Sequence, residues 1–263
     1  PHPLTLNIHA SGRSDSVTLR SGHLAYNESI LRLDGEINGV SESELMDFDL
    51  NIDSSKVLPA DLLALFDGKQ RWRALIQEWP VTRIAGNLNS DNQHLKGDLN
   101  FTSGRGDVRI SVDAEKKDQW IFNSAFYVRD VDLGSVFAGY IDTTRINADL
   151  VLEGDGWNWR SGIYDLKADV FNSTLDTKAI DRLTFSAQML DGYVNHSLRY
   201  EAAEELVTVE GSADLSAADV EWDLQGEAKQ FRPGPWMHNA WLDASVMNFV
   251  FNFDGEGLQF DRL

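Results

Sequence analysis

The sequence predicts an all-β protein built from one antiparallel sheet. Apolar and polar residues alternate along most of the 263 residues, and turn-forming stretches such as "SGRSDS", "TSGRGD" and "RPGP" separate the alternating runs. Helical periodicity is confined to three short segments. Strands buried on both faces of a parallel sheet would be continuously apolar, so alternation favours an antiparallel sheet with one wet and one dry face. We expect roughly a dozen or more strands.

The alternating runs place the expected strands in order along the chain. The segment 145–171 shows the pattern best: Ile146, Leu150 and Leu152 alternate with polar residues, the turn "GDGWNWRSG" follows, and the alternation resumes at Tyr164. The expected strands lie at 4–8, 31–39, 46–52, 84–88, 95–101, 108–112, 126–128, 146–152, 164–170, 183–189, 207–215, 220–224 and 249–253.

Short helices are expected where apolar residues follow helical spacing. Pro59 suits the first turn of a helix in "PADLLALFDG" (59–68), and Pro80 ends the apolar face of "KQRWRALIQEWP" (69–80). The third segment is "DLGSVFAGY" (132–140). We expect these helices to lie as plugs across an apolar surface that would otherwise be open.

One elongated domain is expected over residues 1–263, because no linker or low-complexity stretch divides the chain. The segments 46–66 and 125–137 each run from an alternating strand into a short apolar helix, which indicates a weak internal repeat and a stack of similar β units. Both ends lie inside alternating runs, so we expect a fragment of a longer chain.

Composition and motifs argue against most catalytic and nucleic-acid functions. The formal charge is −19, and no basic cluster is larger than "EKKD" at 115–118, so a phosphate backbone is not the expected partner. Cysteine is absent, and the six histidines are scattered without metal-ligand spacing. The acids fall on polar positions of strands, where no apolar pocket would raise the pKa of a catalytic carboxyl. We expect no enzymatic activity, no cofactor and no metal.

Three stretches carry a family resemblance: "ILRLDGEINGV" (30–40), "VTRIAGNLNSDNQHLKGDLNF" (81–101) and "FYVRDVDLGSVFAGYIDTTRINADLVLEGDGW" (126–157). With them the sequence resembles the AsmA/TamB-like family of bacterial envelope proteins. The resemblance implies a long, strongly twisted sheet curled into an open, taco-like groove. It also implies a periplasmic location in a Gram-negative cell, phospholipid transport or outer-membrane assembly, and outer-membrane assembly proteins as partners. A membrane anchor would lie outside this chain.

The dry face of the sheet is the candidate site. A sheet that is apolar on one face must close, pair with another sheet or hold something apolar, and the resemblance favours a groove that binds phospholipid acyl chains. The residues expected to line it are Ile146, Leu150, Leu152, Leu166, Val170, Leu183, Phe185, Met189, Val207 and Val209. The alternative is a carbohydrate-binding module in which Trp157 and Trp159, at a predicted turn, stack on sugars.

Overall fold

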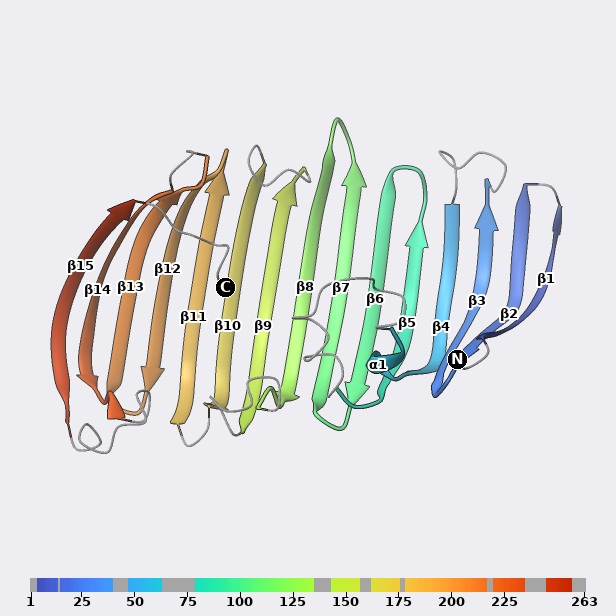
Figure 1. The fold of residues 1–263 in the computed structure, drawn as a ribbon. Coiled ribbons are helices and arrows are strands. Elements are labelled where there is room, and N and C mark those ends of the chain that lie inside the picture. Colours follow the sequence, from blue (N-terminus) through green and yellow to red (C-terminus); the bar gives the residue numbers. More distant parts are fainter. Residues whose placement is uncertain are drawn as a thin grey trace. The chain divides into compact units, whose positions relative to one another are not determined.

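The computed structural model describes residues 4–13, 15–39, 47–62, 79–134, 143–156, 162–175, 178–216, 220–234 and 245–256. Strands hold 81% of these residues, so the predicted all-β class is confirmed. Fifteen strands lie in one antiparallel sheet whose strand order is the chain order, β1 to β15 (Figure 1). The sheet is not closed into a barrel.

Two compact units divide the chain. The first comprises Pro1–Asp118 and Ser124–Asp142, and the second comprises Gln119–Asn123 and Thr143–Leu263. The first unit holds β1 (Leu4–Arg13), β2 (Ser16–Tyr26), β3 (Ser29–Asn38), β4 (Asp47–Val57), α1 (Pro59–Leu62), β5 (Thr82–Ser90), β6 (His94–Ser103) and β7 (Gly106–Lys116). β8 (Trp120–Val131) contributes to both units. The second unit holds β9 (Thr144–Asp155), β10 (Ile163–Leu175), β11 (Lys178–Leu190), β12 (Tyr193–Ala202), β13 (Glu205–Asp214), β14 (Glu221–Phe231) and β15 (Met247–Glu256).

The alternation did not predict two of the strands, β2 and β12. In β2 the register against β3 shifts between Leu19 and Gly22, so the apolar residues change phase in the middle of the strand. In β12, His196 lies at a position where the alternation predicts an apolar residue. Both interruptions are local, and the hydrogen-bonded ladder continues through them.

At one bulge in each unit, a serine hydroxyl forms hydrogen bonds with the backbone of the neighbouring strand. Ser54 has a φ of 46°, and Ser55 after it is fully buried, with its Oγ accepting from Arg32 N at 2.8 Å and donating to Arg32 O at 3.1 Å. In the second unit Ser173 makes the same pair of bonds with the backbone of Asn147, at 2.8 and 3.3 Å. Each hydroxyl thus replaces ladder hydrogen bonds lost at the bulge.

Glycine is required at two of the apolar positions in the first unit. Gly35 has a φ of 146° and Gly86 a φ of 150°, a region that L side chains rarely adopt. A Cβ on Gly35 would also overlap the carbonyl oxygen of Asp49, and one on Gly86 that of Asp98. The glycines in "LDGEI" and "IAGNL" therefore let neighbouring strands approach closely.

The first predicted helix begins where expected, as α1 at Pro59. Its Asp61 is 7% exposed and accepts hydrogen bonds from Asn27 Nδ2 at 2.7 Å, Ser29 Oγ at 2.7 Å and Ser29 N at 3.1 Å. These bonds fasten α1 to the turn between β2 and β3. The rest of 59–68, nearly all of 69–80 and most of 132–140 lie outside the described residues, so the proposed plugs stay a prediction.

Protonating Asp61 is expected to release this contact. Burial by itself raises the pKa of Asp61, but the hydrogen bonds from Asn27 and Ser29 outweigh it, and the pKa lies below its ordinary value of 3.8. A lowered folded-state pKa stabilises the protein above pH 3.8, and this stabilisation is lost as pH falls through the lower value. Asp61→Asn should lower the free energy of unfolding by about 1–3 kcal/mol at pH 7.

Urea titrations of wild type and Asp61→Asn across pH 2.5–7 measure this effect. The difference between the two proteins should shrink below pH 3.8, where the wild-type carboxyl takes up a proton. A difference that does not change with pH would show that the carboxylate charge is unimportant at this contact. Asp53→Asn, on exposed β4 surface, is the matched control.

Candidate functional site

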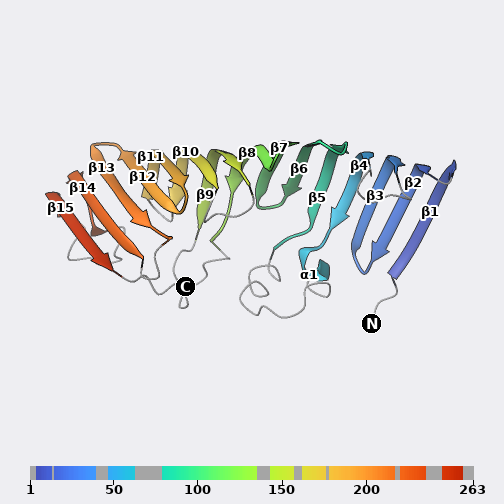
Figure 2. The same cartoon turned by 90° about the horizontal axis from the view of Figure 1, so that it is seen from above.

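The apolar face of the second unit consists of four rows of side chains that cross all seven strands from β9 to β15. Antiparallel register fixes each row, because directly paired residues point to the same face. Figures 1 and 2 show these strands side by side in a single layer. With adjacent strands about 4.8 Å apart, each row is about 29 Å long.

We number the rows from one end of the strands to the other. Row 1 is Gly154, Tyr164, Met189, Val194, Ala213, Trp222 and Gly255. Row 2 is Leu152, Leu166, Ala187, His196, Gly211, Leu224 and Phe253. Row 3 is Leu150, Ala168, Phe185, Leu198, Val209, Gly226 and Phe251. Row 4 is Ala148, Val170, Leu183, Tyr200, Val207, Ala228 and Phe249.

Nine of the ten residues expected to line the groove lie in these rows. They are Leu150, Leu152, Leu166, Val170, Leu183, Phe185, Met189, Val207 and Val209. Ile146 is half-buried and lies just beyond row 4, between the paired residues Arg145 and Ala148, where the register shifts. Trp157 and Trp159, the alternative sugar-stacking pair, lie outside the described residues.

Most side chains of the four rows are only partly buried. The predicted lining residues are all half-buried, and on the last strand Phe249 is 41% and Phe253 is 56% exposed. In the rows only Ala148, Tyr200 and Ala228 are buried. The inner face of a β-sandwich, in contrast, is sealed by the facing sheet. The apolar face therefore retains solvent-accessible apolar surface on which a ligand can bind.

Aromatic rings closely approach two glycines at the β14–β15 end of the face. A Cβ on Gly226 would overlap the ring of Phe251, and a Cβ on Gly255 would overlap the ring of Trp222. Phe251 also packs between Phe249 and Phe253, with centroid distances of 6.1 and 5.5 Å. Glycine thus makes room for a continuous aromatic floor over the last two strands.

A buried ion pair closes one end of the face, beside row 4. Lys178 and Glu205 form a salt bridge with side chains 11% and 6% exposed, and Glu205 also accepts from Arg232 N at 3.3 Å. Tyr200 packs there with Ile180 and Ala202 in the core cluster of this unit. Burial, with the Glu205 and Asp181 carboxylates, raises the pKa of the Tyr200 hydroxyl, which therefore stays protonated.

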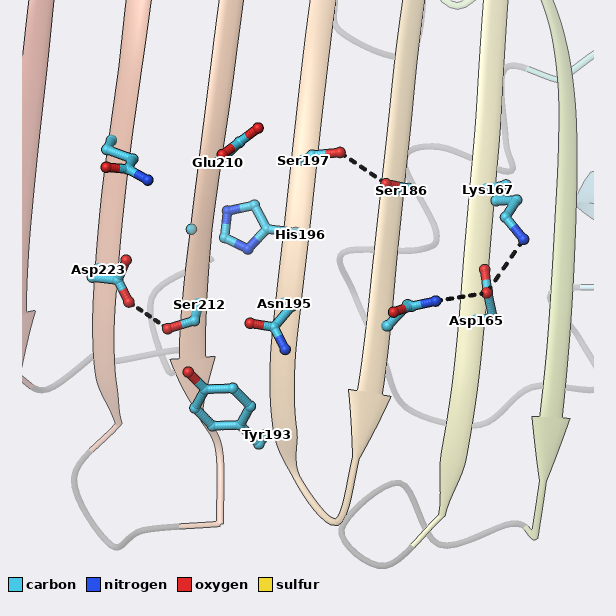
Figure 3. A pocket seen from close by; sticks show the side chains of 13 residues that line it. Asp165, Lys167, Ser186, Tyr193, Asn195, His196, Ser197, Glu210, Ser212 and Asp223 are labelled. Atoms are coloured by element: carbon cyan, nitrogen blue, oxygen red, sulfur yellow. Dashed lines mark hydrogen bonds and ion pairs between the residues drawn. The ribbon is translucent and has the colours of Figure 1, made fainter.

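The opposite face of the same strands is polar and holds a shallow depression of about 540 Å³ (Figure 3). Asp165 accepts from Gln188 Nε2 at 3.1 Å and from Lys167 Nζ at 3.3 Å. The Gln188 hydrogen bond lowers the pKa of Asp165 most, and the Lys167 bond and charge lower it further against the effect of burial. Asp165 and Asp169 thus lie on the outer face, as the alternation predicts.

Among the residues that line the polar depression, no imidazole is hydrogen-bonded to a hydroxyl. Ser186 Oγ and Ser197 Oγ lie 2.8 Å apart, and Ser212 donates to Asp223. His196 is also among the residues that line the depression (Figure 3), but in register it pairs with Ala187 and Gly211, which belong to row 2 of the apolar face. A Ser–His–Asp arrangement requires the imidazole within hydrogen-bond reach of the serine, and these residues do not provide it.

Sequence reasoning predicted a dry face along the whole sheet but named no lining residues on it in the first unit. One row there runs through Leu19, Gly35, Leu50, Leu88, Gly97 and Val112, across β2 to β7. The alternation at 31–39, 84–88 and 95–101 already carries this signal. Row membership of His196, Leu198 and Tyr200 in the second unit was missed for a different reason, since β12 was not predicted.

Within the described ranges, no three acidic or histidine side chains come together in a way that could hold a metal ion. The same residues include no helix with the length and apolar character needed to cross a membrane. Comparisons with protein-family models, with curated proteins and with solved structures found no match. The AsmA/TamB-like resemblance therefore stays a prediction.

Proposed function

We propose that the chain is a non-enzymatic envelope protein that binds the acyl chains of phospholipids on its apolar sheet face. The observation that carries the proposal is the set of four rows, in which half-buried apolar side chains continue across seven strands. Exposed apolar area of this extent is unfavourable in water unless a ligand or partner covers it.

The dimensions of the rows suit acyl chains. A row of about 29 Å is close to the ~30 Å hydrocarbon thickness of a bilayer, which two opposed acyl chains fill. A chain lying along row 3 would contact only apolar side chains and Gly226. Because no covalent chemistry is needed, transport would consist of passage along a continuous apolar path shielded from water.

The AsmA/TamB-like resemblance supports the finer parts of the proposal. By this resemblance, the sheet curls into an open groove and the protein works in the periplasm of a Gram-negative bacterium. The short helices that the sequence pattern predicts would partly cover the apolar face. Phospholipid movement between membranes or outer-membrane assembly would be the process served, with outer-membrane assembly proteins as partners. The acidic surface, with a formal charge of −19, fits a protein that does not bind nucleic acid.

Native mass spectrometry of the protein purified from Gram-negative cells tests the proposal. We expect adducts with the masses of the cellular phospholipids, lost on extraction with organic solvent and restored by incubation with phospholipid vesicles. No adduct before or after vesicle incubation would contradict lipid binding. If, in addition, oligosaccharides quench tryptophan fluorescence saturably and Trp157→Ala abolishes the effect, the carbohydrate-binding alternative is correct.

A further inference from the structure

His196 is the only basic side chain in the four rows of the apolar face. Its neighbours in row 2 are Ala187 on β11 and Gly211 on β13, which are among the smallest residues available. Beyond them the row continues with Leu166 and Leu224. The imidazole therefore lies in apolar surroundings, with no bulky side chain directly on either side of it.

The ring lies over the backbone of β13. Its Cε1 is 2.9 Å from the position that a Cβ on Gly211 would occupy, so the ring fills the space left by the missing side chain. The ring of Phe185 borders it at a centroid distance of 6.4 Å and a tilt of 33°. The imidazole therefore contacts the backbone of β13 at Gly211 and the ring of Phe185, and it remains half-buried.

Neither ring nitrogen of His196 has a hydrogen-bond partner within the part of the chain that the structure describes. The Tyr164 hydroxyl, another polar group of the rows, differs in this respect, since it donates to Gly156 O at 3.0 Å. Without a ligand on the face, water can solvate the imidazole. An acyl chain laid across row 2 would displace this water, which is unfavourable unless the ligand supplies a new partner.

We infer that the ligand of this face is an acyl chain carrying an acidic oxygen group, a carboxylate or a phosphate, which His196 binds. The inference rests on the proposed function and specifies its ligand. An imidazole can donate a hydrogen bond to an oxyanion, and a charge-assisted bond of this kind is stronger than one between neutral groups. The hydrocarbon would lie along the adjoining row 3, so that His196 fixes the head of the ligand at one position on the face.

Three probes separate the possible sources of the acidic group: palmitic acid, lysophosphatidic acid and, as the neutral control, methyl palmitate. Each is titrated against wild type, His196→Phe and His196→Gln by displacement of a fluorescent acyl probe. Phenylalanine retains an aromatic ring without nitrogens, and glutamine retains a hydrogen-bond donor. His23→Phe is the matched control, because His23 lies in the first unit, on the face of β2 where it pairs with the polar residues Asn7 and Arg32.

We expect His196→Phe to weaken one or both acidic probes by at least about tenfold. Methyl palmitate should bind equally to both proteins, and His196→Gln should recover part of the affinity. Weakening of palmitic acid alone identifies a carboxylate ligand, and weakening of lysophosphatidic acid alone identifies a phosphate. Circular dichroism and melting temperature confirm that each variant is folded.

Two results would overturn the inference in distinguishable ways. If all three probes bind wild type and His196→Phe equally, or lose affinity equally, His196 does not recognise the acidic group, although the face still binds acyl chains. If no probe binds wild type, the proposed function itself fails and the inference fails with it.

Discussion

Arginine in place of Leu150 is expected to eliminate bound lipid while the protein still folds. Leu150 is half-buried in row 3, beside Ala168 on β10. On an open face the arginine stem can lie along the apolar surface with its guanidinium in water. The free energy of unfolding should then fall by only about 1–2 kcal/mol, which lowers the melting temperature by roughly 2–8 °C. The charged group would lie in the path of the acyl chain.

Native mass spectrometry and thermal melting of wild type and Leu150→Arg measure both parts of this prediction. The matched control is Val151→Arg, which places the same charge on the neighbouring residue but on the polar face, opposite Lys167 and near Asp149 and Asp165. The control should remain folded and retain lipid. A sealed core would give a different result: wild type without lipid, and a Leu150→Arg variant destabilised by several kcal/mol because an unpaired charge is buried.

Glu205→Gln is expected to have the largest effect on stability. Glu205 and Lys178 are both almost fully buried, and neutralising the carboxylate removes its charge from this buried salt bridge with the Lys178 ammonium group. Losing one partner of a buried pair typically costs about 3–5 kcal/mol. The double variant Lys178→Met/Glu205→Leu should recover most of this loss, because two apolar side chains can replace the pair.

Urea denaturation, followed by tryptophan fluorescence, compares these variants. Glu210→Gln is the control, since Glu210 is exposed on the polar face of the same strand, and it should change stability little. If Glu205→Gln unfolds at the wild-type urea concentration, or if the double variant is less stable than the single one, the pair does not act as described.

Alternation predicted most of this fold because a single sheet with one dry face imposes a period of two on nearly all of its strands. The same regularity explains why residues far apart in sequence, such as Leu152, Met189 and Val209, share one face: in an antiparallel meander, directly paired residues point the same way. The predicted site could therefore be assembled from the pattern without knowledge of the turns.

The features that the sequence did not reveal depend on contacts between strands. The bulge at Ser173 forms because its hydroxyl meets the backbone of Asn147, 26 residues earlier, and no local pattern marks that meeting. Lys178 and Glu205 are likewise 27 residues apart and are joined only by the register of three strands. His196 was overlooked because a polar residue at an apolar position lowers the periodic signal of β12, although it is also what distinguishes this position chemically.

Strand order that equals chain order has a consequence for how the molecule forms and changes. Every registered pairing joins consecutive strands, so most of the closing loops are short and the contact order of each unit is low. Folding can then proceed hairpin by hairpin, each new strand using the previous one as its template, much as in solenoid proteins. Duplication or loss of one hairpin would alter the length of the four rows by two strands and leave the register of all others intact. The reach of the apolar face is thus a quantity that evolution can adjust in steps of about 10 Å.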